Sequence, residues 1–357
     1  MIERLAQKVR TGGRLRRAEA LELYRSAPTA LLGQLADGVR ARKHPDRVVT
    51  YIIDRNVNYT NFCTEYCSFC AFYRPMGSGD GYILSKEAMF EKIQETLDLG
   101  GTGILMQGGL HPDLKIEWYE DLLSSIRERF PRVHLHCFSA PEVLNIAEVS
   151  GLSLRDTIAR LRDAGLQSIP GGGAEILDDE VRRRISRLKC TTEEWIAVHR
   201  TAHDLGLRTT ATMMFGCGET FEHRVRHLLR VRQLQQDTGG FTAFIPWMFQ
   251  RENTSLGRFI REEATAVDYL KTLAISRLML DNIENVQASW LTPGLKLGQV
   301  ALRFGGNDLG SILIEENVVS AAGCVNRTNE EELRRVIRDA GFRPVQRDTL
   351  YRTWLLK

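Results

Sequence analysis

Residues 54–74 read DRNVNYTNFCTEYCSFCAFYR, and both the fold and the chemistry of the chain are organised around this stretch. It continues a strand-like run and carries three cysteines, Cys63, Cys67 and Cys70, in C-x3-C-x2-C spacing. Thiolates are ligands of iron-sulfur clusters and of structural zinc, and three so close in sequence converge on one centre only from an irregular loop. The stretch therefore predicts a metal-binding loop that directly follows a strand.

The number of available ligands distinguishes a structural zinc site from an iron-sulfur cluster. A closed zinc site needs four ligands, and the next histidine along the chain is His111. Three thiolates instead suit a 4Fe-4S cluster that keeps one iron open. Other interpretations stay open: a zinc knuckle, a disulfide that leaves an odd thiol and suits a secreted chain, or three unrelated core cysteines. The other cysteines are scattered and are expected to be small buried side chains: Cys137, Cys190, Cys217 and Cys324.

The composition is that of a globular protein with an ample core. The 357 residues, 43% of them hydrophobic, accommodate one large α/β barrel or two ordinary domains. The formal charge of +3 arises from 48 basic and 45 acidic residues that are interspersed, which argues against nucleic acid and membrane as partners. The first 17 residues lack the apolar core of a signal peptide, and no apolar run approaches ~20 residues. We therefore expect a cytoplasmic protein with reduced thiols.

Strand and helix patterns alternate on both sides of the cysteines. Helical spacing fills residues 1–45, and the β-branched, alternating run 48–60 predicts the strand that leads into the cysteine loop. Five more strands are predicted downstream, with helices between them, at 102–107, 133–139, 166–169, 207–215 and 241–247. Repeated strand-helix units with short turns predict parallel strands with right-handed crossovers. The expected fold is α/β, a complete or partial TIM-type barrel.

A doubly wound parallel sheet is the alternative architecture, because periodicity alone does not separate the two topologies. Strands buried on both faces should read as continuous apolar runs. The run 133–139 instead places His134 and His136 on one face and Leu135 and Cys137 on the other. This alternation favours a barrel with a partly polar lumen that is wide enough for a substrate.

We divide the chain into three parts. Residues 1–47 are expected to form an N-terminal helical cap, residues 48–290 the barrel, and residues 291–357 an α/β extension packed on it. In the extension, Thr328 is the expected cap of a helix that stops at Gly341, and a strand is expected to follow.

Active sites of α/β barrels lie at the C-terminal ends of the strands. The residues that follow the predicted strands, beyond the cysteine loop, are therefore candidates for binding or catalysis: Gln107, Gly108, Gly109, His111, His136 and Glu175. The glycines let backbone groups approach a ligand closely, and the two histidines exchange protons near neutral pH.

Each of these residues also has an ordinary structural interpretation. The Gln107–Gly109 segment could be a tight turn, and Glu175 could be a favourable charge at a helix N-terminus. His111 could brace its loop, and His136 could be a hydrogen-bonded core histidine.

The cysteine spacing, with the aromatic Phe69 before the last cysteine, resembles the motif of the radical S-adenosylmethionine (SAM) superfamily. Further blocks, among them GGTGILMQGGLHPDL, PGGGAEIL, GGFTAFIPWMFQ and LRFGGNDLG, resemble the cyclic dehypoxanthinyl futalosine synthases of the futalosine route to menaquinone. The resemblance runs from about residue 20 to the C-terminus. The same scaffold serves aminofutalosine synthase and the deazaflavin (F0) synthases, which are the alternative functions, and a non-catalytic iron-sulfur or zinc protein is the alternative outside enzymology.

The resemblance implies a 4Fe-4S cluster and SAM as cofactors. The implied cluster ligands are Cys63, Cys67 and Cys70, and the implied SAM contacts are Phe69, Gln107, Gly108, Gly109 and Glu175. The implied reaction removes hydrogen from ribose C4' of dehypoxanthine futalosine, adds the carbon radical to the benzoate ring, and then releases one electron and one proton. His136 and His111 are the expected catalytic residues.

The resemblance also implies partners. The substrate would be a small nucleoside-benzoate, and the electron donor a flavodoxin-like or ferredoxin-like protein. The benzoate carboxylate needs a cation, for which Arg55, Arg74 and Arg303 are candidates. The sequence does not determine the oligomeric state.

Overall fold

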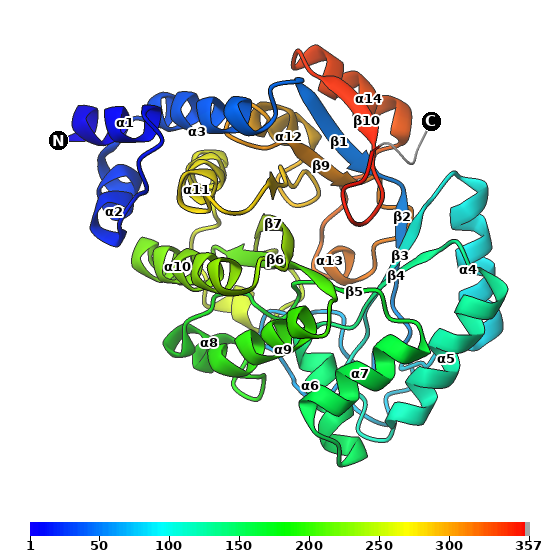
Figure 1. Cartoon of the computed structure of the whole chain (residues 1–357). Coiled ribbons are helices and arrows are strands. Elements are labelled where there is room, and N and C mark those ends of the chain that lie inside the picture. Colours follow the sequence, from blue (N-terminus) through cyan, green and yellow to red (C-terminus); the bar gives the residue numbers. More distant parts are fainter. Residues whose placement is uncertain (354–357) are drawn as a thin grey trace.

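The computed structural model describes residues 1–353 and is built on a parallel seven-stranded sheet that curls into a barrel (Figure 1). Its strands follow one another in sequence order: β2 (Asp54–Val57), β3 (Gly103–Met106), β4 (His134–Cys137), β5 (Ser168–Ile169), β6 (Arg208–Phe215), β7 (Phe241–Met248) and β8 (Asn285–Val286). A doubly wound sheet reverses its strand order at a switch point, and this sheet does not. The barrel prediction is therefore confirmed.

The run 48–60, predicted as one strand, forms two strands that belong to different sheets. Its first half, β1 (Val48–Ile52), pairs in parallel with β10 (Arg343–Gln346) and β9 (Asp308–Ser311), whereas β2 pairs with β3. The prediction was wrong at this point because the pairing partners of a strand, and not its own periodicity, decide to which sheet it belongs.

The second sheet also closes the barrel. The Asn307 N-H donates to the Val286 carbonyl at 3.1 Å, and the Ala288 N-H donates to the Asp308 carbonyl at 2.8 Å. Backbone hydrogen bonds thus lead from β8 through β9 to β1, and β1 continues along the chain into β2. Part of the segment 291–357 is therefore continuous with the barrel, although the predicted boundary at residue 290 separates the two.

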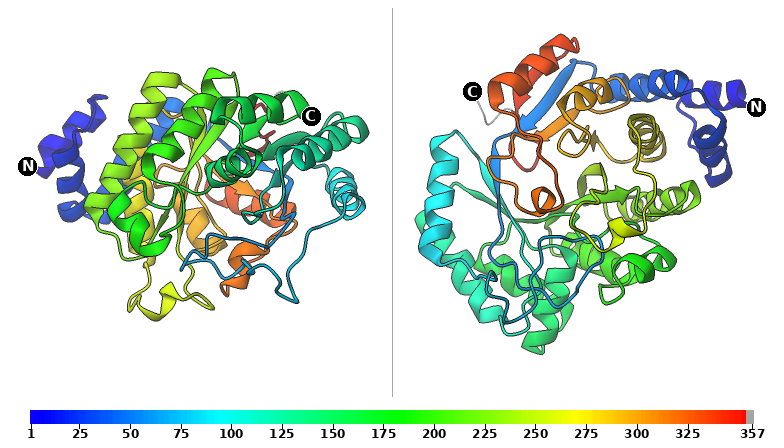
Figure 2. Two further views of the ribbon diagram at one scale, coloured as in Figure 1. Left: turned by 90° about the horizontal axis from the view of Figure 1, so that it is seen from below. Right: turned by 180° about the vertical axis from the view of Figure 1, so that it is seen from behind.

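Helices surround the strands (Figures 1 and 2). They are α1 (Ile2–Arg10), α2 (Arg17–Ser26), α3 (Thr29–Lys43), α4 (Lys86–Asp98), α5 (Ile116–Arg129), α6 (Ala140–Ser150), α7 (Leu154–Ala164), α8 (Asp179–Ile185), α9 (Thr192–Asp204), α10 (Phe221–Thr238), η1 (Leu256–Arg258), α11 (Ala266–Met279), α12 (Leu295–Ala301), α13 (Val318–Ala321) and α14 (Glu330–Asp339). The N-terminal helices pack on the outer helices of the barrel, α3 along α11 and α2 along α10.

The helix boundaries follow local capping chemistry. The side chain of Asn329, and not that of Thr328, accepts the N3 amide at the start of α14, so the predicted cap was one residue early. Both residue types cap helices well, and sequence alone places such boundaries only to within a residue or two. Gly341 follows the helix with φ of +84°, as expected of a glycine stop.

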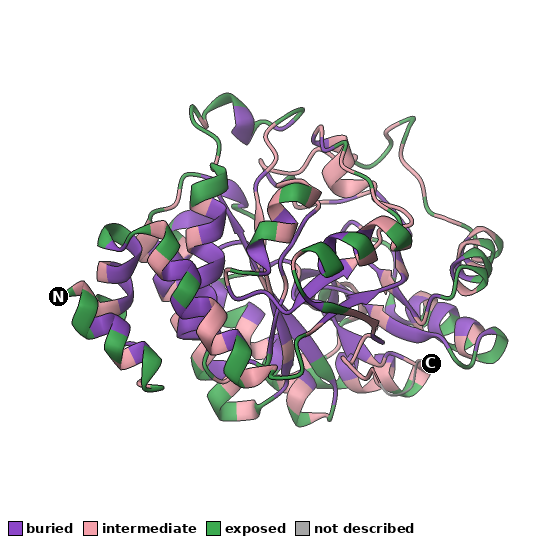
Figure 3. Ribbon diagram, turned by 90° about the horizontal axis from the view of Figure 1, so that it is seen from above, coloured by how far each residue is buried: buried purple, intermediate pink, exposed green. Residues whose placement is uncertain are grey.

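Burial concentrates on the strands and on the inner faces of the helices that cover them (Figure 3). In α5 the buried side chains include Leu122, Leu123 and Ile126, and the opposite face is open to solvent. This amphipathic pattern is what orients each helix against the barrel. Within residues 1–353, no helix combines the length and the apolar character needed to cross a bilayer.

Candidate active site

The lumen of the barrel contains a cavity of about 330 Å³. Lumen-facing side chains of the strands form one part of its wall, and residues of the C-terminal segment form another part. Three residues predicted from sequence line it: Gln107, His136 and Glu175. The structure thus brings together side chains from three different strand ends, as expected of a barrel active site.

The cysteine loop follows β2 and is tied to the next strand end. The Cys63 N-H donates to the Arg74 carbonyl at 3.0 Å, and the Thr64 N-H donates to the Leu110 carbonyl at 3.1 Å. All three loop cysteines are free thiols, with Cys63 and Cys67 buried and Cys70 half-exposed. Burial raises the pKa of the Cys63 and Cys67 thiols, so that only a bound cation would hold them as thiolates at neutral pH.

The spacing of the thiols separates a cluster from a single ion. Within residues 1–353, one group of three or more histidine, cysteine and acidic side chains has its ligand atoms mutually within 4.8 Å, and it does not include the three loop cysteines. Sulfurs bound to one zinc ion at ~2.3 Å lie only about 3.8 Å apart. At least one pair of the three sulfurs is therefore farther apart than sulfurs on a single zinc ion, and this fits a larger cluster.

The glycines after β3 are pressed against the cysteine loop. A Cβ atom on Gly109 would lie 2.1 Å from the Phe62 carbonyl oxygen, and one on Gly108 would lie 2.7 Å from the Tyr59 ring. Their N-H groups are used within the protein, that of Gly108 by Glu142 at 2.9 Å and that of Gly109 by Thr60 at 2.9 Å. Within the described residues, the carbonyl oxygens of Gly108 and Gly109 accept no hydrogen bond.

Glu175 occupies the end of the cavity near the cysteine loop and has a φ of +35°. Its Oε1 lies 3.1 Å from Lys189 Nζ, and its Oε2 lies 3.7 Å from Arg182 and, within the described residues, accepts no hydrogen bond. Asp178, and not Glu175, caps α8 by accepting the Glu180 amide at 3.2 Å. The helix-capping alternative for Glu175 was therefore wrong.

Phe69, the aromatic residue of the cysteine motif, is half-buried beside this pair. The Lys189 Nζ lies 5.3 Å from the centroid of the Phe69 ring. One cation thus contacts both the cysteine loop and Glu175.

His136 projects from β4 into the cavity and shares a hydroxyl with a second histidine. Its Nδ1 and the Nε2 of His134 both lie 2.7 Å from the Oγ of Ser168. Burial, with smaller contributions from His134 and Arg347, lowers the pKa of His136 to about 3. The imidazole is therefore neutral at physiological pH, and it can orient a polar group but not act as a cationic acid.

His111 does not line the cavity. Its Nδ1 accepts the Asp113 N-H at 3.1 Å, its carbonyl accepts from Asn145 at 3.0 Å, and its ring contacts Phe62 edge-on. The geometry favours the loop-bracing alternative over contact with a substrate.

The three arginines considered for the benzoate carboxylate lie outside the cavity and have structural partners. Arg55 pairs with Glu95 at 2.7 Å, Arg74 pairs with Asp80 at 2.5 Å, and Arg303 donates to the Ala340 carbonyl at 2.6 Å.

Sequence reasoning missed two important cations. Lys189 lies in the loop between α8 and α9, and Arg347 follows β10, where it is buried and lines the cavity. Arg347 binds Asp308 through two nitrogens at 2.6 and 3.0 Å. Neither residue follows a barrel strand, so no local signal marked them.

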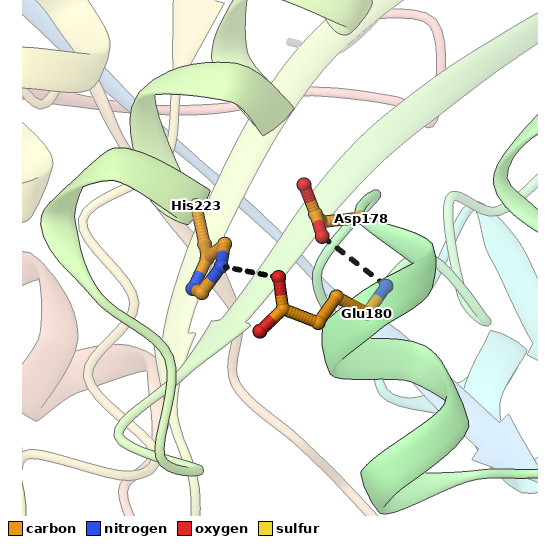
Figure 4. Close-up of side chains that lie close together, drawn as sticks. All are labelled: Asp178, Glu180 and His223. Atoms are coloured by element: carbon orange, nitrogen blue, oxygen red, sulfur yellow. Dashed lines mark hydrogen bonds and ion pairs between the residues drawn. The ribbon is translucent and has the colours of Figure 1, made fainter.

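A second cluster of possible ligands lies outside the lumen (Figure 4). It comprises Asp178, Glu180 and His223. Nδ1 of His223 accepts the Thr220 N-H at 3.0 Å, which leaves the proton of the neutral ring on Nε2, facing Glu180 at 3.7 Å. Asp178 is paired with Arg226 at 2.9 Å. The contacts of the cluster are therefore those of helix capping and ion pairing.

Known proteins share this arrangement over nearly the full chain. Residues 57–231 match the radical SAM superfamily, and residues 238–356 match the CofH/MqnC C-terminal region. The cyclic dehypoxanthine futalosine synthase of Halalkalibacterium halodurans is 50% identical, with 98% of this chain and 94% of the relative covered. The cyclic dehypoxanthine futalosine synthase of Streptomyces coelicolor is 44% identical, with 98% of this chain and 88% of the relative covered.

Among solved structures, methylornithine synthase (PylB) matches the fold. Its TM-score is 0.70 at 19% sequence identity, with 96% of this chain and 97% of that chain covered. This similarity supports the barrel architecture alone. From its sequence relatives, the chain belongs to the radical SAM superfamily and, within it, to the family of the cyclic dehypoxanthine futalosine synthases.

Proposed function

We propose that the chain is an oxidoreductase that cyclises dehypoxanthine futalosine to its cyclic product in menaquinone biosynthesis. The observation that carries the proposal is the position of the cysteine loop, which packs against the strand end after β3, in a barrel whose lumen contains a cavity of about 330 Å³. The full-length similarity to cyclases supports this substrate.

We assign the 4Fe-4S cluster to Cys63, Cys67 and Cys70. With SAM, the cluster supplies a 5'-deoxyadenosyl radical. The free carbonyls of Gly108 and Gly109 can accept hydrogen bonds from the amino group of SAM, and Oε2 of Glu175 is a buried acceptor that lacks a donor. A buried acceptor without a partner costs about 1–3 kcal/mol, which a bound ligand would offset.

The substrate would occupy the central part of the lumen. Trp247 and Trp290 line the cavity and offer flat apolar surfaces to a benzoate ring, and His136 offers a neutral polar group. The barrel encloses the reacting carbon and excludes water and other hydrogen donors. Its contribution is to hold ribose C4' against the benzoate ring while the new carbon-carbon bond forms.

For the benzoate carboxylate we assign Arg347, which is the arginine that lines the cavity. Its guanidinium has five N-H groups, and three of them donate to Asp308 and to the Asp348 carbonyl. Asp308 already balances the charge of Arg347. The contact with the benzoate carboxylate would therefore consist of hydrogen bonds from the remaining two N-H groups of the guanidinium.

The reaction also needs a base for the proton that leaves the benzoate ring. Asp54 and Glu316 line the cavity, and no cation lies within 4 Å of either in the described residues. Burial raises the pKa of both carboxyls, and this makes them stronger bases. We assign the base to this pair. We assign the external electron to a flavodoxin-like or ferredoxin-like donor.

The test is anaerobic. The reconstituted protein is mixed with SAM, dithionite and dehypoxanthine futalosine, and the products are identified by mass spectrometry. A product lighter than the substrate by two hydrogens, formed together with 5'-deoxyadenosine, is the expected result. Deoxyadenosine without that product would contradict the substrate assignment, and the enolpyruvyl-benzoate substrate of aminofutalosine synthase would be tested next.

A further inference from the structure

Three loops meet at Ser68, between the second and third cysteines of the loop. The Ser68 N-H donates to the Ile185 carbonyl at 2.9 Å, and the Leu256 N-H donates to the Ser68 carbonyl at 2.8 Å. The segments 63–75, 183–189 and 251–261 are therefore neighbours, and their exposed residues are called here the cysteine-loop face.

Large apolar side chains are exposed on this face. They are Tyr66 at 47%, Leu188 at 58% and Phe259 at 79% exposure. A surface groove of about 870 Å³ is lined by Cys70, Tyr73 and Arg258, among others. The ring of Tyr66 contacts that of Tyr73, and Phe259 follows Arg258, so both lie next to the groove. Clustered exposed apolar side chains next to a concave surface mark interaction sites.

The face also carries more unpaired positive than negative charge. The segment 183–189 has three arginines and Lys189 and no acidic residue. No ion pair in the described residues involves Arg187, Arg258 or Arg261. The acidic residues of the three segments are Glu65 and Glu252, and they leave the excess positive.

The groove is separate from the substrate cavity. No residue lines both of them in the part of the chain that the structure describes. Cys70, the half-exposed thiol of the loop, lies in the wall of the groove. The groove therefore gives an approach to the cluster that does not pass through the lumen.

We propose that the cysteine-loop face docks the protein that donates the electron, and that this donor is a small acidic one-electron carrier. The inference rests on the proposed cluster at Cys63, Cys67 and Cys70. In the encounter, the reduced donor loses one electron and the cluster gains it. Encounters of redox proteins bury less than about 1,200 Å² and depend on complementary charge, which suits a face that carries both exposed apolar side chains and unpaired arginines.

The test compares two reductants on the same variants. The face variant is R187E/R258E, and a second variant is F259S. The control is R155E, because Arg155 is exposed, has no ion-pair partner in the described residues, and stands in the first turn of α7, where a glutamate is tolerated. Cluster reduction by a flavodoxin hydroquinone and by dithionite is followed by anaerobic stopped-flow, and flavodoxin binding to the cluster-free chain is measured by calorimetry.

The expected result is that R187E/R258E slows reduction by flavodoxin about 10-fold or more at low salt and weakens binding, with the difference shrinking as salt rises. The variant F259S should slow cluster reduction by flavodoxin at all salt concentrations. Reduction by dithionite should be unchanged, and R155E should match the unsubstituted chain. Equal rates with flavodoxin for all variants, or equal slowing with both reductants, would overturn the proposal. Failure of the proposed cluster would be seen separately, as no reduction by dithionite in the unsubstituted protein.

Discussion

The ammonium nitrogen of Lys189 lies 3.1 Å from Oε1 of Glu175 and 5.3 Å from the centroid of the Phe69 ring. The Lys189 and Glu175 side chains are only 13% and 5% exposed. Burial alone would lower the pKa of Lys189, but the charge of Glu175 raises it above its ordinary value. A permanent positive charge therefore lies between the cysteine loop and Glu175.

Replacing that charge should make the cluster harder to reduce. In K189M the added electron loses a nearby cation, and we expect the reduction potential to fall by about 60 mV, equivalent to ~1.4 kcal/mol for a one-electron couple. The measurement is a redox titration followed by electron paramagnetic resonance. K189R keeps the charge and should restore most of the potential. An unchanged potential in K189M, with the cluster fully loaded, would contradict the electrostatic role.

The glycine after β3 should be required for assembly of the cysteine loop. An alanine Cβ at Gly109 would lie 2.1 Å from the Phe62 carbonyl oxygen and 2.8 Å from the Cys63 Cβ, so the loop must move. We expect G109A to bind severalfold less iron and sulfide after reconstitution. The control is G79A, because nothing lies within 4 Å of a Cβ at Gly79. Full iron content in G109A would show that the loop adapts.

Cys67 should be required for the cluster and dispensable for the fold. C67A removes one of three ligands, so we expect loss of the brown colour and of SAM cleavage, with an unchanged circular dichroism spectrum. The matched control is C137A, since Cys137 is a buried cysteine of β4 outside the loop. It should retain the cluster and lose only about 1 kcal/mol of unfolding free energy. Retention of activity by C67A would refute the ligand assignment.

His136 should position the substrate. We expect H136A to keep its cluster and its binding of SAM but to turn over ~10- to 100-fold more slowly, because a misplaced substrate loses its near-attack geometry. H203Q is the control, as His203 is hydrogen-bonded to Thr209 and Thr238 and does not line the cavity. Turnover by H136A at the normal rate would assign His136 to the core.

Acid should destabilise the fold through buried neutral histidines. Burial lowers the pKa of His134 to about 4 and that of His227 to about 3, against about 6.5 in the unfolded chain. As the pH falls, the two histidines are therefore protonated in the unfolded state before they are protonated in the folded state. The stabilising contribution is complete above pH 6.5 and is lost as the pH falls toward 3 to 4, by at most ~1.4 kcal/mol per pH unit for each histidine.

Urea unfolding at several pH values measures this effect. In the unsubstituted chain, the Leu177 N-H donates to Nδ1 of His227 at 2.9 Å. The variant H227N keeps an acceptor for this N-H and removes the titrating ring. Its unfolding free energy should decline less steeply between pH 6.5 and pH 4 than that of the unsubstituted chain. Parallel curves for the two proteins would rule out a contribution from His227.

The sequence by itself determined the features that depend on residues close together in the chain. The spacing of Cys63, Cys67 and Cys70 indicated the cluster loop, because ligands within eight residues need no distant partner to converge. Alternation of short strands with amphipathic helices indicated a parallel barrel.

The tertiary structure alone decided the features that depend on packing between distant segments. It split the run 48–60 between two sheets, since β1 pairs with strands that lie about 260 residues or more further along the chain. It placed Lys189 against Glu175 and Phe69, brought Arg347 into the lumen, and paired Arg55 and Arg303 elsewhere. The physical reason is that a local pattern specifies how a segment folds, whereas burial and long-range hydrogen bonding decide which charges face each other.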